Sequence, residues 1–143
     1  MNLWTYNQYE FEEIQAHKEP FIIISIRTPG AEPMRTPQGP NVRGVLLMAF
    51  PDLDNNYKAL PAEYRNEYTD DELFNAKHAK EILTFVAQHK EGVESIIIQC
   101  EGGLSRSRAV KAALDKLLNG NDAPYDGTND LVYETILETA IRG

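Results

Sequence analysis

The sequence predicts an α/β domain in which a mostly parallel central sheet carries helices on both faces. Three short apolar runs, at residues 21–26, 42–50 and 94–99, are typical of strands, and the first and third predict buried ones. Amphipathic helical patterns follow the second and third runs, and strands that alternate with helices form parallel sheets. At 143 residues, the chain is most economically a single domain that spans 1–143.

The N-terminal half divides at its prolines and glycines. Residues 4–18 are mixed in character and predict a short helix or turn that leads to Pro20. Residues 21–26 have no polar alternation, so we expect this strand at the centre of the sheet. Residues 28–40 are rich in proline and glycine and predict an exposed loop before the strand at 42–50.

The chain between the second and third apolar runs predicts an irregular segment and then a helix. Residues 57–68 show no sustained periodicity and predict irregular structure. Thr69 with Glu72 three residues later forms a capping-box pattern, which predicts a helix from there to about Lys90. This helix is expected to act as scaffold.

The C-terminal region predicts a turn-rich segment and a last helix. Residues 119–129 contain turn-forming residues, and either Asn129 or Asp130 can cap a helix that runs to Ile141. The pattern therefore predicts one more amphipathic helix against the core.

Net charge, hydropathy and the number of cysteines restrict the partners and the cellular compartment that we expect for this protein. The net charge of −8, from 22 acidic and 14 basic residues, disfavours general binding to nucleic acid or to anionic membranes. No apolar run approaches the length of a membrane span, so we expect a cytoplasmic protein. A single cysteine excludes an internal disulfide, and the isolated histidines predict no metal site.

The most informative stretch is the strand, glycine loop and helix that surround Cys100. Gly102 and Gly103 permit a loop that turns its amides inward, and the helix that follows presents unpaired N–H groups and the positive end of its dipole. Such a loop is a candidate cradle for an oxyanion. A cysteine at its mouth is favoured as a thiolate at neutral pH.

Arg106 and Ser107 complete the candidate site. The planar guanidinium of an arginine can grip two oxygens of a phosphate, and a serine hydroxyl can donate to the cysteine sulfur. Nucleophile, cradle and clamp thus fall within eight residues.

The pattern Cys-x-x-Gly-x-x-Arg-Ser resembles the signature of the cysteine-dependent protein tyrosine phosphatase superfamily, above all its dual-specificity branch and its compact bacterial and phage-type members. The resemblance implies that Cys100 attacks phosphorus, that Ser107 stabilises the leaving thiolate, and that no metal or other cofactor is needed. Gln99 stands where this family usually has histidine. The implied phosphate loop comprises Glu101, Gly102, Gly103, Leu104, Ser105 and Arg106.

A general acid is required to protonate the departing oxygen, and two aspartates are candidates. Asp52 and Asp54 follow the strand at 42–50, where α/β enzymes place functional groups. In the resembled family the acid lies on such a loop, and Phe50-Pro51-Asp52 matches the context found in compact members. We therefore favour Asp52 as general acid and base, with Asp54 as the alternative; a turn-forming role for both stays open.

The predicted substrates are phosphorylated proteins, through phosphotyrosine or dual-specificity chemistry, or small phosphomonoesters. The sequence does not define the oligomeric state. An alternative from another class is a catalytically weak or inactive phosphate-binding module that recognises phosphorylated partners. A simpler alternative is that Cys100 is a buried apolar thiol and Arg106 a surface charge.

Overall fold

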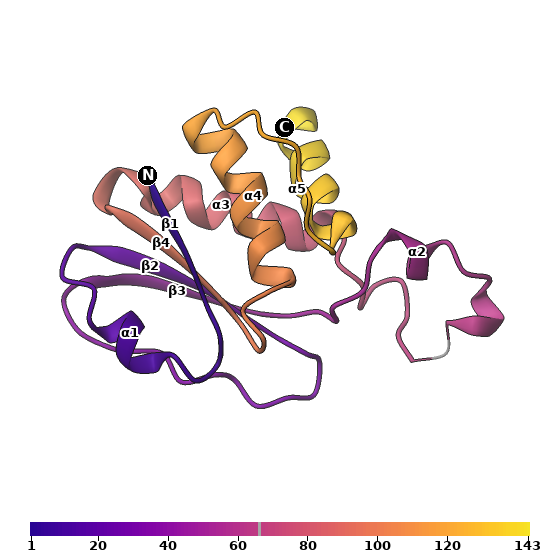
Figure 1. Cartoon of the computed structure of the whole chain (residues 1–143), viewed down its shortest axis with the longest axis horizontal. Helices are drawn as coiled ribbons and strands as arrows, with labels where there is room; N and C mark the ends of the chain where they lie inside the picture. Colours follow the sequence, from indigo (N-terminus) through magenta and orange to yellow (C-terminus); the bar gives the residue numbers. More distant parts are fainter. Residues whose placement is uncertain (66) are drawn as a thin grey trace.

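The structure confirms the predicted α/β architecture. A computed structural model, which describes residues 1–65 and 67–143, contains one four-stranded sheet in the order β1-β4-β2-β3. All three strand pairs in this sheet are parallel, and Figure 1 shows the helices against it. The strands are β1 (Asn2–Tyr6), β2 (Phe21–Arg27), β3 (Val42–Ala49) and β4 (Ser95–Cys100).

The three predicted strands are present, and the first of them is central as expected. β2 pairs with β4 on one side and with β3 on the other. Every side chain from Phe21 to Ile26 is buried, and so is every side chain of β4. An apolar run without alternation therefore marked the strands that are covered on both faces.

The prediction for residues 4–18 was wrong at its beginning. Residues 4–6 belong to strand β1, and the short helix α1 (Phe11–Gln15) follows it. β1 is an edge strand that pairs only with β4, and its side chains range from half-buried to exposed. An edge strand needs no continuous apolar run, so its sequence carries a weak strand pattern.

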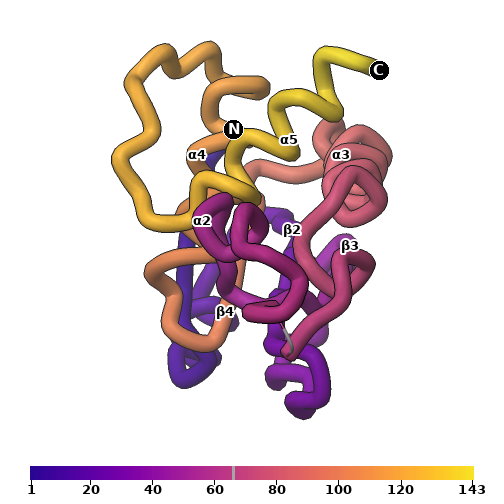
Figure 2. Tube along the Cα trace, turned by 90° about the vertical axis from the view of Figure 1, so that its right-hand side faces the viewer, coloured from indigo at the N-terminus to yellow at the C-terminus, as the bar shows by residue number. Residues whose placement is uncertain are grey.

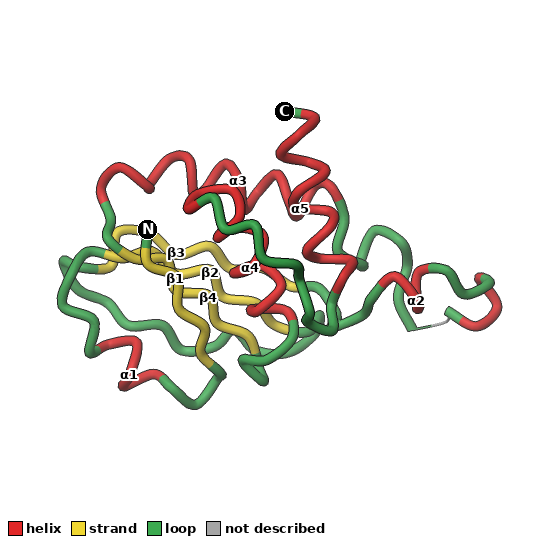
Figure 3. The backbone as a smooth tube through the Cα atoms, turned by 45° about the horizontal axis from the view of Figure 1, so that its top comes forward, coloured by secondary structure: helices red, strands yellow, loops and turns green. Residues whose placement is uncertain are grey.

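The segment between β3 and the next long helix contains two short helical turns, which project from the main body (Figures 1 and 3). They are α2 (Asn55–Lys58) and the 3-10 helix η1 (Ala62–Tyr64). The irregular structure predicted for residues 57–68 agrees with these brief elements where they are described. Residue 66, within that prediction, lies outside the described residues.

Helix α3 (Ala76–His89) begins later than the capping-box pattern predicted. Glu72 does accept hydrogen bonds from the backbone N–H and the hydroxyl of Thr69, but these close an isolated turn. The actual cap is Asn75, whose side chain accepts from the N–H of Lys77. His78 completes this capping box by accepting from the Asn75 N–H. The 3-10 helix η2 (Lys90–Gly92) follows the helix.

Helices cover the two faces of the sheet unequally (Figure 3). α3, α4 (Arg106–Asn119) and α5 (Asp130–Arg142) pack on one face, whereas the short α1 packs on the other. Asn129 caps α5 by accepting from the N–H of Val132, so the first of the two predicted caps is correct. No helix in the described part of the chain is long and apolar enough to cross a membrane.

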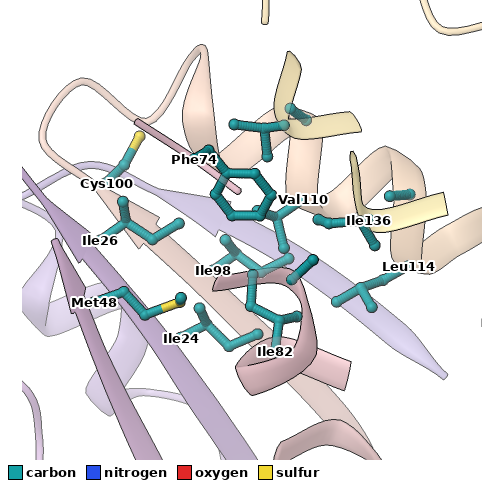
Figure 4. Close-up of a cluster of buried hydrophobic side chains, with 14 of the residues drawn as sticks. Ile24, Ile26, Met48, Phe74, Ile82, Ile98, Cys100, Val110, Leu114 and Ile136 are labelled. Carbon is teal, nitrogen blue, oxygen red and sulfur yellow. The ribbon is translucent and has the colours of Figure 1, made fainter. Parts of the chain in front are cut away.

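The larger core lies between the sheet and the three long helices (Figure 4). Alternate residues of β2 and β4 point into it, and Phe74, ahead of α3, packs edge-on against Phe50. Cys100 lies at the loop end of this cluster in Figure 4. Residues that contribute to the cluster include Ile24, Ile26, Met48, Ile82, Ile98, Val110, Leu114 and Ile136.

We predict that Asn75→Ala lowers the free energy of unfolding by about 1 kcal/mol, because α3 loses its N-cap. Thr69→Ala is the matched control: it removes an exposed turn contact and is expected to have a smaller effect. Urea unfolding of both variants measures the difference. An equal or larger loss in Thr69→Ala would contradict the assignment of the cap.

Candidate active site

The candidate phosphate loop connects the carboxyl end of β4 to the first turn of α4. Arg106 and Ser107 are the first two residues of that helix, and both are buried. The ends of the neighbouring parallel strands β2 and β3 lie at the same edge of the sheet. Side chains that follow three different strands are therefore brought around Cys100.

The sulfur of Cys100 has two hydrogen-bonding neighbours within the loop. The backbone N–H of Gly103 donates to Sγ at 3.1 Å, and Ser107 Oγ lies 3.2 Å from Sγ. A backbone N–H and a hydroxyl are both groups that can donate to a sulfur acceptor. The cysteine is buried, but its two polar contacts distinguish it from an apolar core thiol.

The loop requires glycine at one position. Gly103 has a φ of +71°, and a Cβ there would lie 2.9 Å from the backbone nitrogen of Asn7. A side chain would clash with the end of β1 and move the N–H that reaches the sulfur. Gly102, for which the sequence suggested the same role, has no positive φ and has open space around its Cα.

The two terminal nitrogens of the Arg106 guanidinium donate hydrogen bonds to three residues. Nη1 donates to the carbonyl of Phe50 at 2.8 Å and to Thr28 Oγ1 at 3.3 Å. Nη2 donates to Glu101 Oε1 at 3.0 Å. Nε is buried and has no hydrogen-bond partner among the described residues.

The donors left on Arg106 suit an oxyanion. A guanidinium has five N–H bonds, and the three contacts leave the Nε hydrogen and one Nη2 hydrogen. Thr28 and Glu101, which also bond to each other, lie against the Nη1 and Nη2 end. Nε and Nη2 share one edge of the guanidinium, so an N–H from each can donate to two oxygens of one phosphate.

Glu101 has a role that its place in the loop did not reveal. Its carboxylate accepts from the backbone N–H of Thr28 at 2.7 Å, from the Thr28 hydroxyl and from Arg106. The Thr28 hydroxyl bond is the main cause that lowers the pKa of Glu101; partial burial opposes it, and Arg106 adds to the lowering. Glu101 therefore orients the arginine as an ionised carboxylate.

Asp52, but not Asp54, contacts the phosphate loop. Asp52 Oδ1 accepts from Ser105 Oγ at 2.7 Å and from Asn129 Nδ2 at 2.8 Å. Asp54 instead caps α2, accepting from the backbone N–H of Tyr57 at 3.1 Å. Of the two aspartates, the structure thus brings only Asp52 to the loop, and it gives Asp54 a helix-capping role.

The second oxygen of Asp52 is free to carry a proton. Oδ2 makes no hydrogen bond with any described residue, whereas Oδ1 already accepts two. Because Ser105 donates to Asp52, the hydroxyl of Thr128, 2.9 Å away, donates to Ser105. This chain of hydrogen bonds fixes the carboxyl group of an otherwise exposed side chain.

The side chain of Gln99 is buried and bridges two neighbouring segments. Its Oε1 accepts from Ser25 Oγ at 3.3 Å, and its Nε2 donates to the carbonyl of Asn7 at 3.4 Å. The amide therefore ties the end of β4 to β2 and to the segment after β1. It supports the backbone that packs against Gly103.

Three residues of the site were missed by sequence reasoning, namely Thr28, Asn129 and Asn7. Thr28 directly follows the central strand, a position that could have marked it as a candidate. Asn129 was expected only as a helix cap, and its second bond to Asp52 spans 77 residues. Contacts of that kind leave no local pattern in a sequence.

Among the described residues, neither Leu104 nor any histidine forms a hydrogen bond with the sulfur of Cys100. Leu104 is 70% exposed at the tip of the loop. Within residues 1–65 and 67–143, no group of three or more His, Cys, Asp or Glu side chains could hold a metal ion. His78 belongs to the cap of α3, and His89 Nδ1 lies 2.8 Å from the carbonyl of Phe85.

Comparisons of this chain with protein-family models, with curated proteins and with solved structures found no match. The family resemblance therefore rests on the motif around Cys100.

We predict that Glu101→Gln changes how stability depends on pH. The pKa of Glu101 is lower in the folded chain than its ordinary value of 4.5, so the unfolded chain binds the proton first as pH falls. The stabilisation by Glu101 is complete above pH 4.5 and is lost as pH falls through the lower folded-state pKa. Urea unfolding between pH 3 and 7 should show a smaller acid-induced loss in the variant.

The control is Glu91→Gln, in an exposed part of η2. It is expected to follow the wild-type dependence on pH. If Glu101→Gln also followed it, the carboxylate would not contribute as an ionised partner of Arg106 and Thr28.

Proposed function

We propose that this protein hydrolyses phosphate monoesters through a phosphocysteine intermediate on Cys100. The observation that carries the proposal is the buried guanidinium of Arg106, whose Nε–H has no hydrogen-bond partner among the described residues. A buried donor without a partner is costly, and an oxyanion in the loop would satisfy it. The positive end of the α4 helix dipole also favours an oxyanion in the loop.

In the first step, the Cys100 thiolate attacks phosphorus in line with the ester oxygen. The S–P bond forms while the P–O bond breaks, and Asp52 Oδ2 gives its proton to the leaving oxygen. Arg106 and the N–H groups of the loop hold the other three phosphate oxygens. Ser105 and Asn129, which donate to Asp52 Oδ1, keep the acid oriented during the transfer.

In the second step, water attacks the phosphocysteine. Asp52, now ionised, takes a proton from the water, the new P–O bond forms, and the S–P bond breaks. The sulfur leaves as a thiolate, to which Ser107 Oγ and the Gly103 N–H can donate. No step requires a metal ion or an organic cofactor.

The resemblance to the dual-specificity branch of the protein tyrosine phosphatases favours phosphorylated proteins as substrates, with phosphotyrosine included. Small phosphomonoesters fit the same chemistry. A module that binds phosphate without turnover would use the same loop and guanidinium, so the test below separates the two functions by catalysis.

We predict that the wild type hydrolyses para-nitrophenyl phosphate in EDTA and that Cys100→Ser abolishes turnover. Asp52→Ala should lower kcat about 10²- to 10⁴-fold and remove the acidic pH optimum, because the leaving group then lacks its proton donor. Rates measured from pH 4.5 to 8 test both statements.

The matched control is Asp54→Ala, which removes the cap of α2 but no contact to the loop. It should keep nearly wild-type kcat. Turnover that survives in Cys100→Ser would sink the phosphocysteine mechanism. A well-folded wild type without turnover, whose Cys100 is still protected from alkylation by vanadate, would favour the binding module.

We predict that Asn129→Asp separates helix capping from orientation of the acid. An aspartate still accepts the Val132 N–H, so the cap of α5 is retained, but the donor to Asp52 is lost. The expected fall in kcat is about tenfold, the value of one hydrogen bond to a charged group. A neighbouring carboxylate also disfavours ionised Asp52, so the pH optimum should move upward.

Asn129→Ala loses both contacts and should show the same fall in kcat together with about 1 kcal/mol of lost stability. Steady-state kinetics across pH and urea unfolding distinguish the two variants. Wild-type kcat and pH profile in Asn129→Asp would show that Asn129 does not position Asp52.

A further inference from the structure

A cavity of about 500 Å³ lies beside the phosphate loop. Leu104 and Thr128 line it at the loop end, and Arg108 and Lys111 of α4 line it along the helix. Thr128 is also the residue that hydrogen-bonds Ser105 of the loop. The connection between α4 and α5, which contributes Thr128, arches outward beside α4 (Figure 2).

We propose that this cavity is a second anion subsite that selects phosphate monoesters bearing a further phosphate or carboxylate group. The inference rests on the proposed function, because it assigns the phosphate that reacts to the Cys100 loop. A substrate that occupies both places would extend from the loop past Leu104 to the side chains of α4.

Two cations supply the recognition. Arg108 and Lys111 are three residues apart on α4 and so lie on the same helix face. Neither side chain forms an ion pair or hydrogen bond with a residue that the structure describes. Arg108 and Tyr125 line the same cavity. The Tyr125 hydroxyl accepts from the N–H of Asn129 at 3.1 Å, and the Asn129 side chain in turn donates to Asp52, so this wall of the cavity is continuous with the candidate active site.

Two acidic residues also line the cavity. Asp115 is seven residues beyond Arg108, about 10 Å along the helix axis, but only four residues beyond Lys111. Its two oxygens accept from the amides of Asn119 at 2.8 Å and Asn121 at 2.7 Å, so the carboxylate is oriented toward the end of α4. Asp126 is exposed on the connection, two residues before Thr128. Arg108, in the first turn of α4 and about two turns from Asp115, is therefore the principal cation of the subsite, and Lys111 is the second.

The charge of the whole chain makes this pair of cations selective. With a net charge of −8, most of the surface repels anions, and a local positive site determines where a multiply charged substrate is bound. A cavity of about 500 Å³ is also large enough for a small anionic group or an acidic side chain.

The test compares substrates in matched pairs. In one arm, a phosphotyrosine peptide with neighbouring glutamates is compared with the same peptide carrying glutamines. In the other, a small bisphosphate is compared with the corresponding monophosphate. The measured quantities are kcat/KM for the wild type and Kd, by calorimetry, for Cys100→Ser, each with and without the double change Arg108→Gln and Lys111→Gln.

The wild type should prefer the more anionic member of at least one pair by roughly threefold to tenfold, and the double change should remove most of that preference. A preference for acidic peptides alone, or for the bisphosphate alone, identifies the source of the second anion. Lys116→Gln, an exposed cation of α4 outside the cavity, should leave the preference intact.

An absent preference in both arms, or one that the double change leaves unaltered, would overturn the subsite. Failure of the proposed function is distinguishable from this result. If the wild type turned over no substrate, the Kd values for Cys100→Ser would still show whether Arg108 and Lys111 discriminate between the paired ligands.

Discussion

The burial of one cation organises this end of the molecule. The guanidinium group of Arg106 cannot be removed from water without partners, and its partners come from the ends of three strands. The Phe50 carbonyl follows β3, Thr28 follows β2, and Glu101 follows β4. A single side chain thereby fixes the relative positions of the segments that carry the candidate nucleophile and the candidate acid.

A second set of hydrogen bonds connects Asp52, the candidate acid, to the helices. The side-chain Oδ1 of Asn129 caps α5, and its Nδ2 donates to Asp52. Ser105 of the phosphate loop donates to the same carboxylate. The orientation of Asp52 thus depends on the packing of α5 against α4, which buries Val132 and Ile136 in the main core. The same residues contribute to stability and to the proposed chemistry. The effects of substitutions here are therefore interpreted from urea unfolding and enzyme kinetics together.

Charge is distributed unevenly between the site and the rest of the surface. The chain is acidic as a whole, yet the first turns of α4 combine Arg106, Arg108 and Lys111 with the positive end of the helix dipole. Glu101 offsets part of this charge through its ion pair with Arg106, whereas Arg108 and Lys111 form no ion pair with a described residue. These two cations and the helix dipole together favour an anion near the first turns of α4.

The features that depend on neighbours in the chain were predictable from the sequence. Continuous apolar runs predicted the central strands, and the glycines between Cys100 and Arg106 predicted the tight connection from β4 to α4, because strand burial and a tight turn both require particular residues at short range. Other features depend on distant contacts and emerge only in three dimensions: the edge strand β1, the choice of Asp52 over Asp54 as the aspartate at the loop, and the second role of Asn129. These follow from how the strand ends meet, and side chains 53 and 77 residues apart leave no periodic trace of their contact.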